Sequence, residues 1–402
     1  MSARVAVAAR VAAQLVGIPW TAGRSSSDDP PRRLFAMGDP QAPLQRMLEV
    51  LDANGLLGED GFLAPAASLL SIGDHFDYAG EAAEVGREGL MILRWLAEHS
   101  PRQAILIAGN HDLCRVMEFA SETDERFARA RERAAALHDA RLSGQADPAQ
   151  MEDALKRFFE EFPGIPTPRL VARDCLSFSE AQRALVRSLL LAGRMRLAQA
   201  ARVRLPGGPR DVLVTHSAVT RRDLLLLRTP LERDPRLLAR RLNELLDGAV
   251  ERVRDAWERG VPVAMDLAPV HISGSTGREG GGLLLHRPAN PGSGASFGNW
   301  ELDSEAPRRF DPRDMPRGLA QVCGHCRHRS NLRELGEWIA PSALTFEAGR
   351  LRTLRTDRAR VVYEGGISEA DPGEAVLYLI DAEMRVVEPA AYPLLPVEQW
   401  LA

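Results

Sequence analysis

Cysteine and long apolar runs are scarce in this 402-residue chain, and neither sign of charge is in large excess. The four cysteines, Cys114, Cys175, Cys323 and Cys326, are too few for a disulfide scaffold at this length and favour a reducing, cytoplasmic location. No apolar run approaches the roughly 20 residues that cross a membrane, so we expect no membrane partner. The formal net charge of -4 gives no indication of a nucleic-acid partner.

The composition is that of a globular protein, with 45% hydrophobic and 26% charged residues. Arg4 and Arg10 interrupt the apolar stretch 1–20, which favours an amphipathic helix over a signal peptide. Residues 21–33 are polar and rich in Pro and Ser, as in a linker. We therefore expect an N-terminal helix and linker over 1–33 and a folded domain over 34–402.

A repeated pattern begins at residue 34, in which a short apolar run leads into glycine and a polar cluster. The runs are 34–37, 68–72 and 104–108, and the stretches between them have helical periodicity. This strand–helix–strand order predicts parallel pairing and an α/β fold. In such sheets ligands bind beyond the carboxyl ends of the strands, where the three polar clusters lie.

Residues 114–205 interrupt this pattern with charged segments of helical character, and we interpret the stretch as a helical insertion over the site. Two further apolar runs follow. Residues 211–215 precede His216, and residues 319–323 precede Gly324 and His325. The sequence thus places polar side chains after five successive strands, which turn chemistry alone explains poorly.

Most of these polar side chains are oxygen or imidazole donors. The candidates are Asp39, Gln41, Asp74, Asp77, Asn110, His111, His216, His325 and His328. Mixed ligation by Asp, Asn and His suits divalent ions such as Mn²⁺, Fe²⁺ or Zn²⁺, and suits neither a thiolate zinc site nor an all-oxygen calcium site. A carboxylate that bridges two such ions would form a centre that activates water and clamps a phosphoryl group.

The five motifs resemble those of the calcineurin-like metallophosphoesterase superfamily. They are GDPQ (38–41), GDHFD (73–77), GNHD (109–112), VTHS (214–217) and GHCRH (324–328). The loop GLLGEDG (55–61) and the segment EGGIS (364–368) are similar to the bacterial branch related to serine/threonine phosphoprotein phosphatases. The resemblance implies a central β-sandwich flanked by helices, in four layers. It also implies a hydrolase of phosphoric esters with a dinuclear centre and a metal-bound hydroxide.

The resemblance further implies a role for each matching residue. Asp74 would bridge the two ions, Asp39 and Gln41 would bind the first, and Asn110, His216 and His325 would bind the second. His111 would be the general acid, with Asp77 orienting its ring, and Asn110 would also touch the substrate phosphate. Mn²⁺ is the first choice of metal, with Fe²⁺, Zn²⁺ and Mg²⁺ as alternatives.

Three positions depart from the family pattern. Gln41 stands where most relatives have a metal-binding histidine, which favours Mn²⁺ or Mg²⁺ or else weakens the first site. Tyr78 stands where phosphoprotein phosphatases have a phosphate-binding arginine. Arg221, Arg287 or Arg327 would replace it from another loop. The second histidine of the last motif, His328, comes one residue late and would reach back to the first metal. His75 either faces the site or is structural.

Two rival functions remain open. A non-catalytic metallophosphoesterase-like module that binds a partner would explain Gln41, but it would not need a general acid such as His111. Cys323 and Cys326 have the spacing of a thiol–disulfide motif, which we interpret as coincidence because the usual thioredoxin-type context is missing. The expected partner is a phosphorylated substrate, whether a small molecule, a nucleotide or a phosphoprotein.

Overall fold

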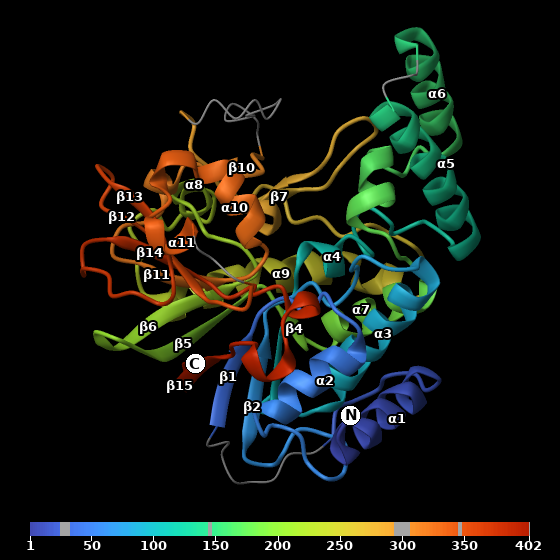
Figure 1. Cartoon of the computed structure of the whole chain (residues 1–402). Coiled ribbons are helices and arrows are strands. Elements are labelled where there is room, and N and C mark those ends of the chain that lie inside the picture. Colours follow the sequence, from blue (N-terminus) through green and yellow to red (C-terminus); the bar gives the residue numbers. More distant parts are fainter. Residues whose placement is uncertain (25–32, 144–146, 293–305, 345–347, 402) are drawn as a thin grey trace.

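The computed structural model describes residues 1–24, 33–143, 147–292, 306–344 and 348–401, so much of the predicted N-terminal linker lies outside the described residues. Its central element is a mixed sheet of eleven strands (Figure 1). In spatial order these are β13 (Val361–Gly365), β12 (Arg352–Thr356), β14 (Ala375–Leu379), β11 (Ala320–Cys323), β6 (Gly208–Thr215), β5 (Ala198–Leu205), β15 (Leu395–Leu401), β1 (Arg33–Met37), β2 (Ala67–Ser71), β3 (Ala104–Ile107) and β4 (Met195–Arg196).

The sheet consists of two parallel parts joined by antiparallel strands. In one part β1, β2, β3 and β4 run parallel, with Leu34 opposite Ser68 and Leu70 opposite Ile105. In the other part β11 is parallel to both β6 and β14. Strands β15 and β5 pair antiparallel between the two parts, and β12 and β13 extend the far edge. The parallel pairing predicted from the strand–helix–strand order is confirmed.

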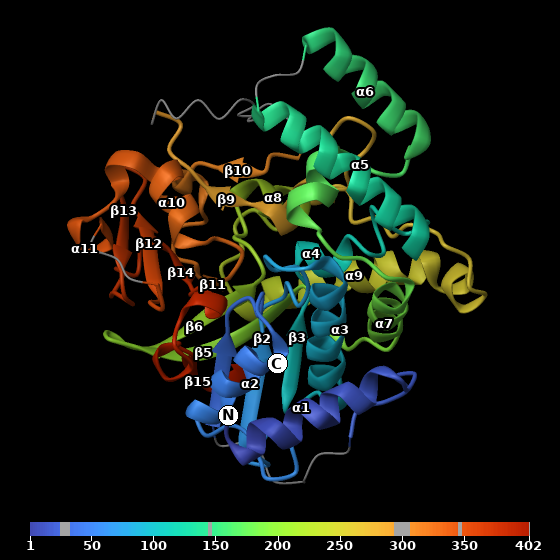
Figure 2. The ribbon, with the colours of Figure 1, turned by 45° about the vertical axis from the view of Figure 1, so that its right-hand side comes forward.

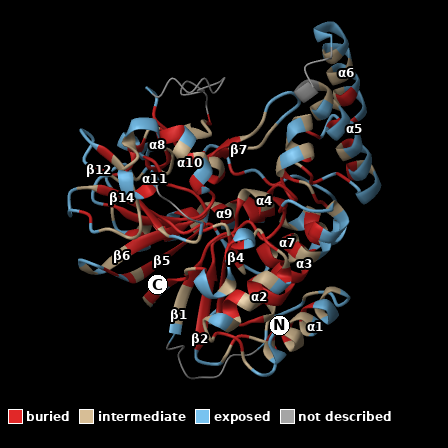
Figure 3. Cartoon of the chain, viewed as in Figure 1, coloured by how far each residue is buried: buried red, intermediate tan, exposed pale blue. Residues whose placement is uncertain are grey.

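Helices cover one face of this sheet. Met37, Leu69 and Leu106 point to a core shared with α2 (Leu44–Ala53), α3 (Ala82–Glu98), α7 (Glu180–Leu191) and α9 (Pro235–Glu258). The alternate residues of the same strands, such as Ala36, Leu70 and Ile107, join Val212 and Val322 in a cluster with no helical member among the described residues. Since these side chains are buried, the strands of the two parts cover this face for one another (Figure 3).

The N-terminal helix α1 (Ala3–Val16) forms as predicted and packs on the domain. Val5, Ala8 and Ala12 are buried in the core shared with α2 and α3. Ser2 caps the helix by accepting a hydrogen bond from the Val5 amide. The small residues let α1 lie close to its neighbours, so this helix covers apolar surface that the domain would otherwise expose.

The insertion is helical over a shorter range than expected. It contains α5 (Asp124–Ser143), α6 (Pro148–Glu161), the π-helical turn η1 (Leu170–Asp174) and α7. Helices α5 and α6 project from the body (Figure 2) and share a separate apolar cluster that includes Phe119, Phe158 and Phe162. Residues 195–205, predicted as part of the insertion, instead form β4 and β5 of the main sheet. The sheet context outweighs the helical propensity of this alanine-rich segment.

The remaining elements are short. They are α4 (Asn110–Leu113), α8 (Arg221–Leu226), α10 (His328–Leu335), α11 (Pro341–Leu344) and two small paired ribbons, β7 (His271–Ile272) with β8 (Gly281–Gly282) and β9 (Arg287–Pro288) with β10 (Arg309–Phe310). Single 3₁₀ turns lie at Leu283–Leu285, Pro312–Asp314, Gly336–Trp338, Met384–Val386 and Pro389–Ala391. Among the described residues, none of the helices has both the length and the apolar character that crossing a bilayer requires.

Candidate metal centre and acid–base pair

The polar clusters predicted after the strands meet at one place. Asp39 follows β1, Asp74 follows β2, His111 follows β3, and His216 and His325 follow β6 and β11. All of these except His216 line a cavity of about 350 Å³, which we call the site cavity. Its lining residues are Asp39, Gln41, Asp74, Asp77, Tyr78, Ala79, His111, Arg173, Asp174, Leu176, Arg287, His325, Arg327 and Ser330.

Four donor atoms converge beside this cavity. The Nε2 atom of His216 lies 3.1 Å from Asn110 Oδ1, 3.2 Å from His325 Nδ1 and 3.4 Å from Asp74 Oδ1. Asp74, His216 and His325 thus form one group whose ligand atoms all lie within 4.8 Å of one another, and all three are buried. Two imidazole nitrogens and two oxygens directed at one point are a fitting donor set for a divalent ion.

The orientation of His216 and the neutral form of His325 suit a ligand role. His216 Nδ1 lies 3.0 Å from the Ile72 carbonyl oxygen, to which it donates in the tautomer that leaves Nε2 free. Burial, with Arg287 and His216 adding to it, holds the pKa of His325 well below its usual value, so its ring is neutral. Metal ions bind neutral imidazole, and therefore the His325 ring does not have to lose a proton first.

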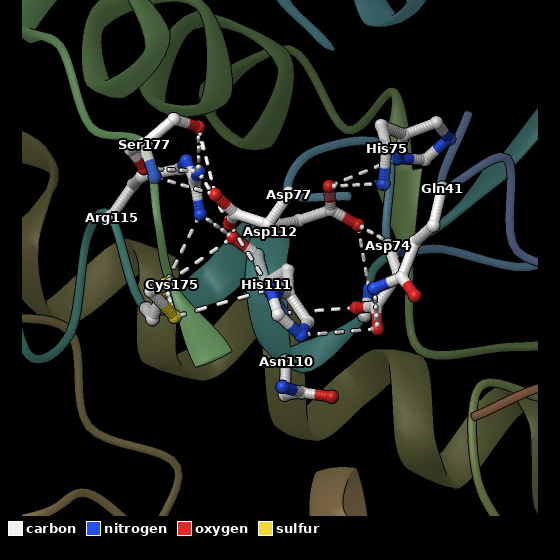
Figure 4. A network of polar contacts seen from close by, with 12 residues as sticks. Gln41, Asp74, His75, Asp77, Asn110, His111, Asp112, Arg115, Cys175 and Ser177 are labelled. Carbon is white, nitrogen blue, oxygen red and sulfur yellow. Dashed lines mark hydrogen bonds and ion pairs between the residues drawn. The ribbon is translucent and has the colours of Figure 1, made fainter. Parts of the chain in front are cut away.

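His111 and Asp77 form an adjacent pair. His111 Nδ1 lies 3.0 Å from Asp77 Oδ2, and its Nε2 lies 3.7 Å from Asp74 Oδ2 (Figure 4). Asp77 is fixed in turn by Arg115, whose Nη2 donates to Asp77 Oδ2 at 2.8 Å. The amide and hydroxyl of Ser177 donate to Asp77 Oδ1 at 2.7 and 2.8 Å. The ring of His111 is therefore held with Nε2 directed towards the metal-binding group.

Opposing effects set the pKa values of this pair. Burial alone would lower the pKa of His111, but the carboxylates of Asp74 and Asp77 outweigh it and raise that pKa to about 9. Burial would raise the pKa of Asp77, but Arg115 and His111 outweigh it and lower that pKa to about 2. At neutral pH the pair is thus an imidazolium held by a carboxylate, which is the form that a proton donor needs.

Strained backbone accompanies these side chains. Asp74, Asp77 and His325 have φ values of 55°, 65° and 60°, in the left-handed region that side chains other than glycine seldom adopt. Gly109 allows the close approach, because a Cβ there would overlap the backbone and carboxylate of Asp74. Backbone strain of this kind concentrates at functional sites, which agrees with the position of these residues.

The first predicted metal site is less complete. Asp39 is 3% exposed, and its Oδ2 accepts from the His325 amide at 2.9 Å, while no described group bonds its buried Oδ1. Burial, then the charges of Asp381 and Asp74, raise the pKa of Asp39 well above its usual value. Gln41 Nε2 donates to Asp74 Oδ2 at 3.2 Å and its Oε1 accepts from Arg327. An unpartnered buried carboxylate oxygen is suited to bind a cation, whereas the amide oxygen of Gln41 already accepts a hydrogen bond from Arg327.

Three candidates lie away from the centre. His75 is structural, because its Nδ1 lies 3.0 Å from Asp112 Oδ1 and its Nε2 lies 3.0 Å from Ser71 Oγ. His328 does not reach back to the metal ligands, because its Nδ1 lies 2.8 Å from the hydroxyl oxygen of Tyr363. Among the proposed substitutes for the missing arginine, Arg287 and Arg327 line the site cavity, whereas Arg221 begins α8 outside its lining.

Sequence reasoning missed four residues at the site. Asp112 closes the third motif and accepts hydrogen bonds from the amides of Asp74, His75 and Gly109. Asp381 follows β14 and raises the pKa of Asp39, and the strand-end rule that found Asp39 would also have found it. Arg115 and Arg173 had no local signal, because their roles depend on where the insertion folds back.

A second group of ligand type includes a thiol. Asp77, His111 and Cys175 have ligand atoms within 4.8 Å of one another, and Cys175 Sγ lies 3.4 Å from Cys114 Sγ.

Cys323 and Cys326 are buried in an apolar cluster, and burial raises the pKa of both thiols, that of Cys326 to about 12. An activated redox thiol needs a lowered pKa, so the structure gives no support to the thiol–disulfide interpretation.

Comparisons with protein-family models, with curated proteins and with solved structures find no match for this chain. The α/β character and the large mixed sheet flanked by helices are therefore shown by the structure alone. The same holds for the clustered metal-ligand side chains.

Proposed function

We propose that the chain is a metal-dependent phosphoesterase of the calcineurin-like metallophosphoesterase kind, with the four-layer fold of that superfamily. The order of the five motifs supports this proposal. So does their location after β1, β2, β3, β6 and β11 of a sheet whose strands cover one of its own faces. The reaction is the hydrolysis of a phosphate mono- or diester.

One observation carries the proposal. A buried group of metal-ligand type and an imidazolium–carboxylate pair meet at Asp74, which lies 3.4 Å from His216 Nε2 and 3.7 Å from His111 Nε2. A metal site alone would not need a fixed proton donor beside it. Phosphoester hydrolysis needs both a cationic centre for the phosphoryl group and a proton for the leaving oxygen.

The described residues fit the first ion, beside Asp39 and Gln41, less well than the second. Asn110, His216, His325 and Asp74 would hold one ion, and Asp39, Gln41 and Asp74 would hold the other, with Mn²⁺ as the best match to mixed oxygen and nitrogen donors. Two such ions, when bound, stabilise the charge of the phosphoryl group and activate water. To serve as a ligand, the Gln41 amide must give up its contact with Arg327.

The side chains of the chain perform the remaining steps. His111 Nε2 delivers its proton to the leaving oxygen, and Asp77 stabilises the charged ring and fixes its orientation. Arg115 keeps Asp77 ionised, and Arg115 and Ser177 together hold it in place. Arg327 borders the cavity where the phosphoryl group would lie, so its guanidinium is placed to bind the phosphoryl oxygens.

The test is hydrolysis of p-nitrophenyl phosphate and bis-p-nitrophenyl phosphate after chelation, with Mn²⁺, Mg²⁺, Zn²⁺ or Fe²⁺ added back. We expect metal-dependent turnover that is lost in Asp74→Asn, and the ratio of the two rates assigns monoesterase or diesterase activity. Absence of turnover with every metal, in protein shown to be folded, would refute the proposal.

A non-catalytic module that binds a partner is the second candidate, and the state of Gln41 favours it. Its amide oxygen faces Arg327, and Asp39 belongs to neither group of clustered ligands among the described residues. Such a module would bind metal through His216 and His325 but would hydrolyse neither nitrophenyl ester. The same assay, combined with a measurement of bound metal, therefore distinguishes the two functions.

A further inference from the structure

Positive side chains stand at both ends of the site cavity. At one end the cavity shares Asp39, Gln41, Tyr78, Ala79 and Arg327 with a smaller cavity of about 50 Å³. At the other end it shares His111, Asp174 and Arg287 with a cavity of about 60 Å³. Arg327 thus marks the Gln41 end, and Arg287 marks the His111 end.

A third arginine reaches the site cavity from the insertion. Arg173 lies in η1 and lines the cavity together with Asp174 and Leu176. The chain that follows η1 lies against the acid–base pair, as Cys175 and Ser177 beside His111 and Asp77 show (Figure 4). The insertion therefore contributes a positive side chain, Arg173, and a negative one, Asp174, to the site cavity.

Arg173 and Arg287 are not neutralised within the described part of the chain. Neither side chain has a hydrogen bond or an ion pair to a described residue, although Arg287 is only partly exposed. Their neighbours differ in this respect, because Arg308 pairs with Glu279, and Asp174 lies 3.8 Å from Arg169 Nη2. Arg173 is exposed and can be solvated by water, but Arg287 is half-buried, and a half-buried guanidinium without a counter-charge is unfavourable unless a ligand supplies one.

The position of His111 relates this charge to the substrate. In the proposed function His111 protonates the leaving oxygen, so the leaving group lies at the His111 end of the cavity. Arg287 stands at that end and also lines the adjoining cavity of about 60 Å³. A leaving group without charge would leave Arg287 unpaired there, whereas an anionic one would accept the paired hydrogen bonds that guanidinium groups form.

We propose that Arg173 and Arg287 bind a second anionic group on the leaving-group side of the substrate. This inference rests on the proposed function and narrows it. The substrates are phosphate esters or anhydrides whose leaving group carries a further phosphate or carboxylate. The insertion then selects the substrate through Arg173, and Arg327 remains for the phosphoryl group that reacts.

The test measures binding of phosphonates, whose carbon–phosphorus bond the proposed reaction does not cleave. Titration calorimetry on the full chain with saturating Mn²⁺ compares propylphosphonate, 3-phosphonopropionate and ethane-1,2-diphosphonate. We expect at least one of the two ligands with a second anionic group to bind about tenfold more tightly than propylphosphonate. Whichever of these two ligands binds more tightly shows whether the second anionic group is a carboxylate or a phosphate.

The variants Arg173→Gln and Arg287→Gln should each remove most of that preference and leave the affinity for propylphosphonate unchanged. Arg133→Gln, an exposed arginine of α5, and Arg221→Gln, at the start of α8, are matched controls that should keep the preference. Equal affinity of the wild type for all three ligands would overturn the inference. An equal loss of affinity for all three phosphonates in Arg173→Gln and Arg287→Gln would also overturn it.

The outcome is independent of turnover. If the nitrophenyl esters are not hydrolysed but the preference for the second anionic group remains and depends on Arg173 and Arg287, the proposed function fails and the binding site stands. If the esters are hydrolysed and the preference is absent, the phosphoesterase proposal stands and this assignment of the substrate class fails.

Discussion

His111 is held by a chain of contacts that fixes the orientation of its ring, as the proposed proton transfer requires. Asp77 contacts its Nδ1, and Arg115 and Ser177 contact Asp77, so that three segments of the chain fix one imidazole ring. Arg115 and His111 overcome the effect of burial and lower the pKa of Asp77 to about 2, so the carboxylate that orients His111 stays ionised. In the free cavity, the charged ring also offsets the negative charge of Asp74.

Replacement of His111 by alanine should lower kcat for p-nitrophenyl phosphate by about 10² to 10⁴, because the leaving oxygen loses its proton donor. Bound Mn²⁺ should be unchanged, because His111 is outside the group formed by Asp74, His216 and His325. His138→Ala on α5 is the matched control and should keep full activity. Equal activity of the two variants would exclude His111 as the acid.

His99 allows a test of stability that is independent of the site. It is buried, its Nε2 accepts from the Leu63 amide at 2.9 Å, and its ring packs on Trp95. Burial lowers the pKa of His99 from 6.5 to about 4. The unfolded chain therefore binds this proton at higher pH than the folded chain does. The contribution of His99 to the free energy of unfolding is therefore complete above pH 6.5 and is lost as the pH falls towards 4.

Between pH 7.5 and 4, His99 should account for about 3 kcal/mol of the fall in the free energy of unfolding. His99→Gln keeps an acceptor for the Leu63 amide but does not titrate. The free energy of unfolding of this variant should therefore fall less over this pH range than that of the wild type, by about the same 3 kcal/mol. Urea unfolding in metal-free buffer at several pH values measures both curves. Parallel curves for the two proteins would show that His99 is not buried in its neutral form.

At the scale of elements, α1 shows how a single face can matter. Ala12 is buried against the domain core, and its neighbour Ala13 is exposed on the same helix. Ala12→Asp should destabilise the chain by about 3 kcal/mol, because it places a carboxylate without a partner in an apolar contact. Ala13→Asp has the same cost in helix propensity and should destabilise the chain by no more than about 1 kcal/mol.

Thermal unfolding of these two variants measures the difference directly. If both variants melt together with the wild type, α1 does not pack on α3 in solution. If the melting temperatures of both variants fall equally, the loss of stability comes from helix propensity and not from the buried face of α1.

The sequence predicted most of the centre because the relevant residues follow strands. Asp39, Asp74, His111 and His325 each come after an apolar run, and parallel strands bring their carboxyl ends to one edge. Asp381 obeys the same rule after β14 but has no counterpart among the five motifs. The motifs therefore did not predict Asp381, although its position after a strand does.

The errors came from features that a local pattern does not contain. Residues 198–205 are rich in alanine and arginine, so their intrinsic propensity favours a helix. In the folded chain they form β5, which pairs with both β6 and β15. His328 follows His325 closely in sequence, yet α10 begins there and directs its ring to Tyr363. Arg115 and Arg173 gain their positions from long-range folding of the insertion, which no spacing predicts.

At the scale of the whole molecule, the centre joins the two parts of the sheet. Asp74 comes from the β1–β4 part, and His216 and His325 come from the part that contains β6 and β11. Between these parts β5 and β15 pair antiparallel. An ion bound to all three side chains would cross-link the two parts in the folded chain and would find no such arrangement in the unfolded one. Metal binding should therefore stabilise the whole domain.

The expected gain in the free energy of unfolding is about 2.7 kcal/mol at a free Mn²⁺ concentration one hundred times the dissociation constant. Asp74→Asn and His216→Ala should each lose most of this gain, whereas His138→Ala, on α5, should retain it. His111→Ala should also retain it, which separates the ligands from the proton donor. Thermal unfolding with and without Mn²⁺ measures the gain in each protein. A shift of equal size in Asp74→Asn and wild type would place the ion elsewhere, and the coupling of the two parts of the sheet through Asp74 would then be wrong.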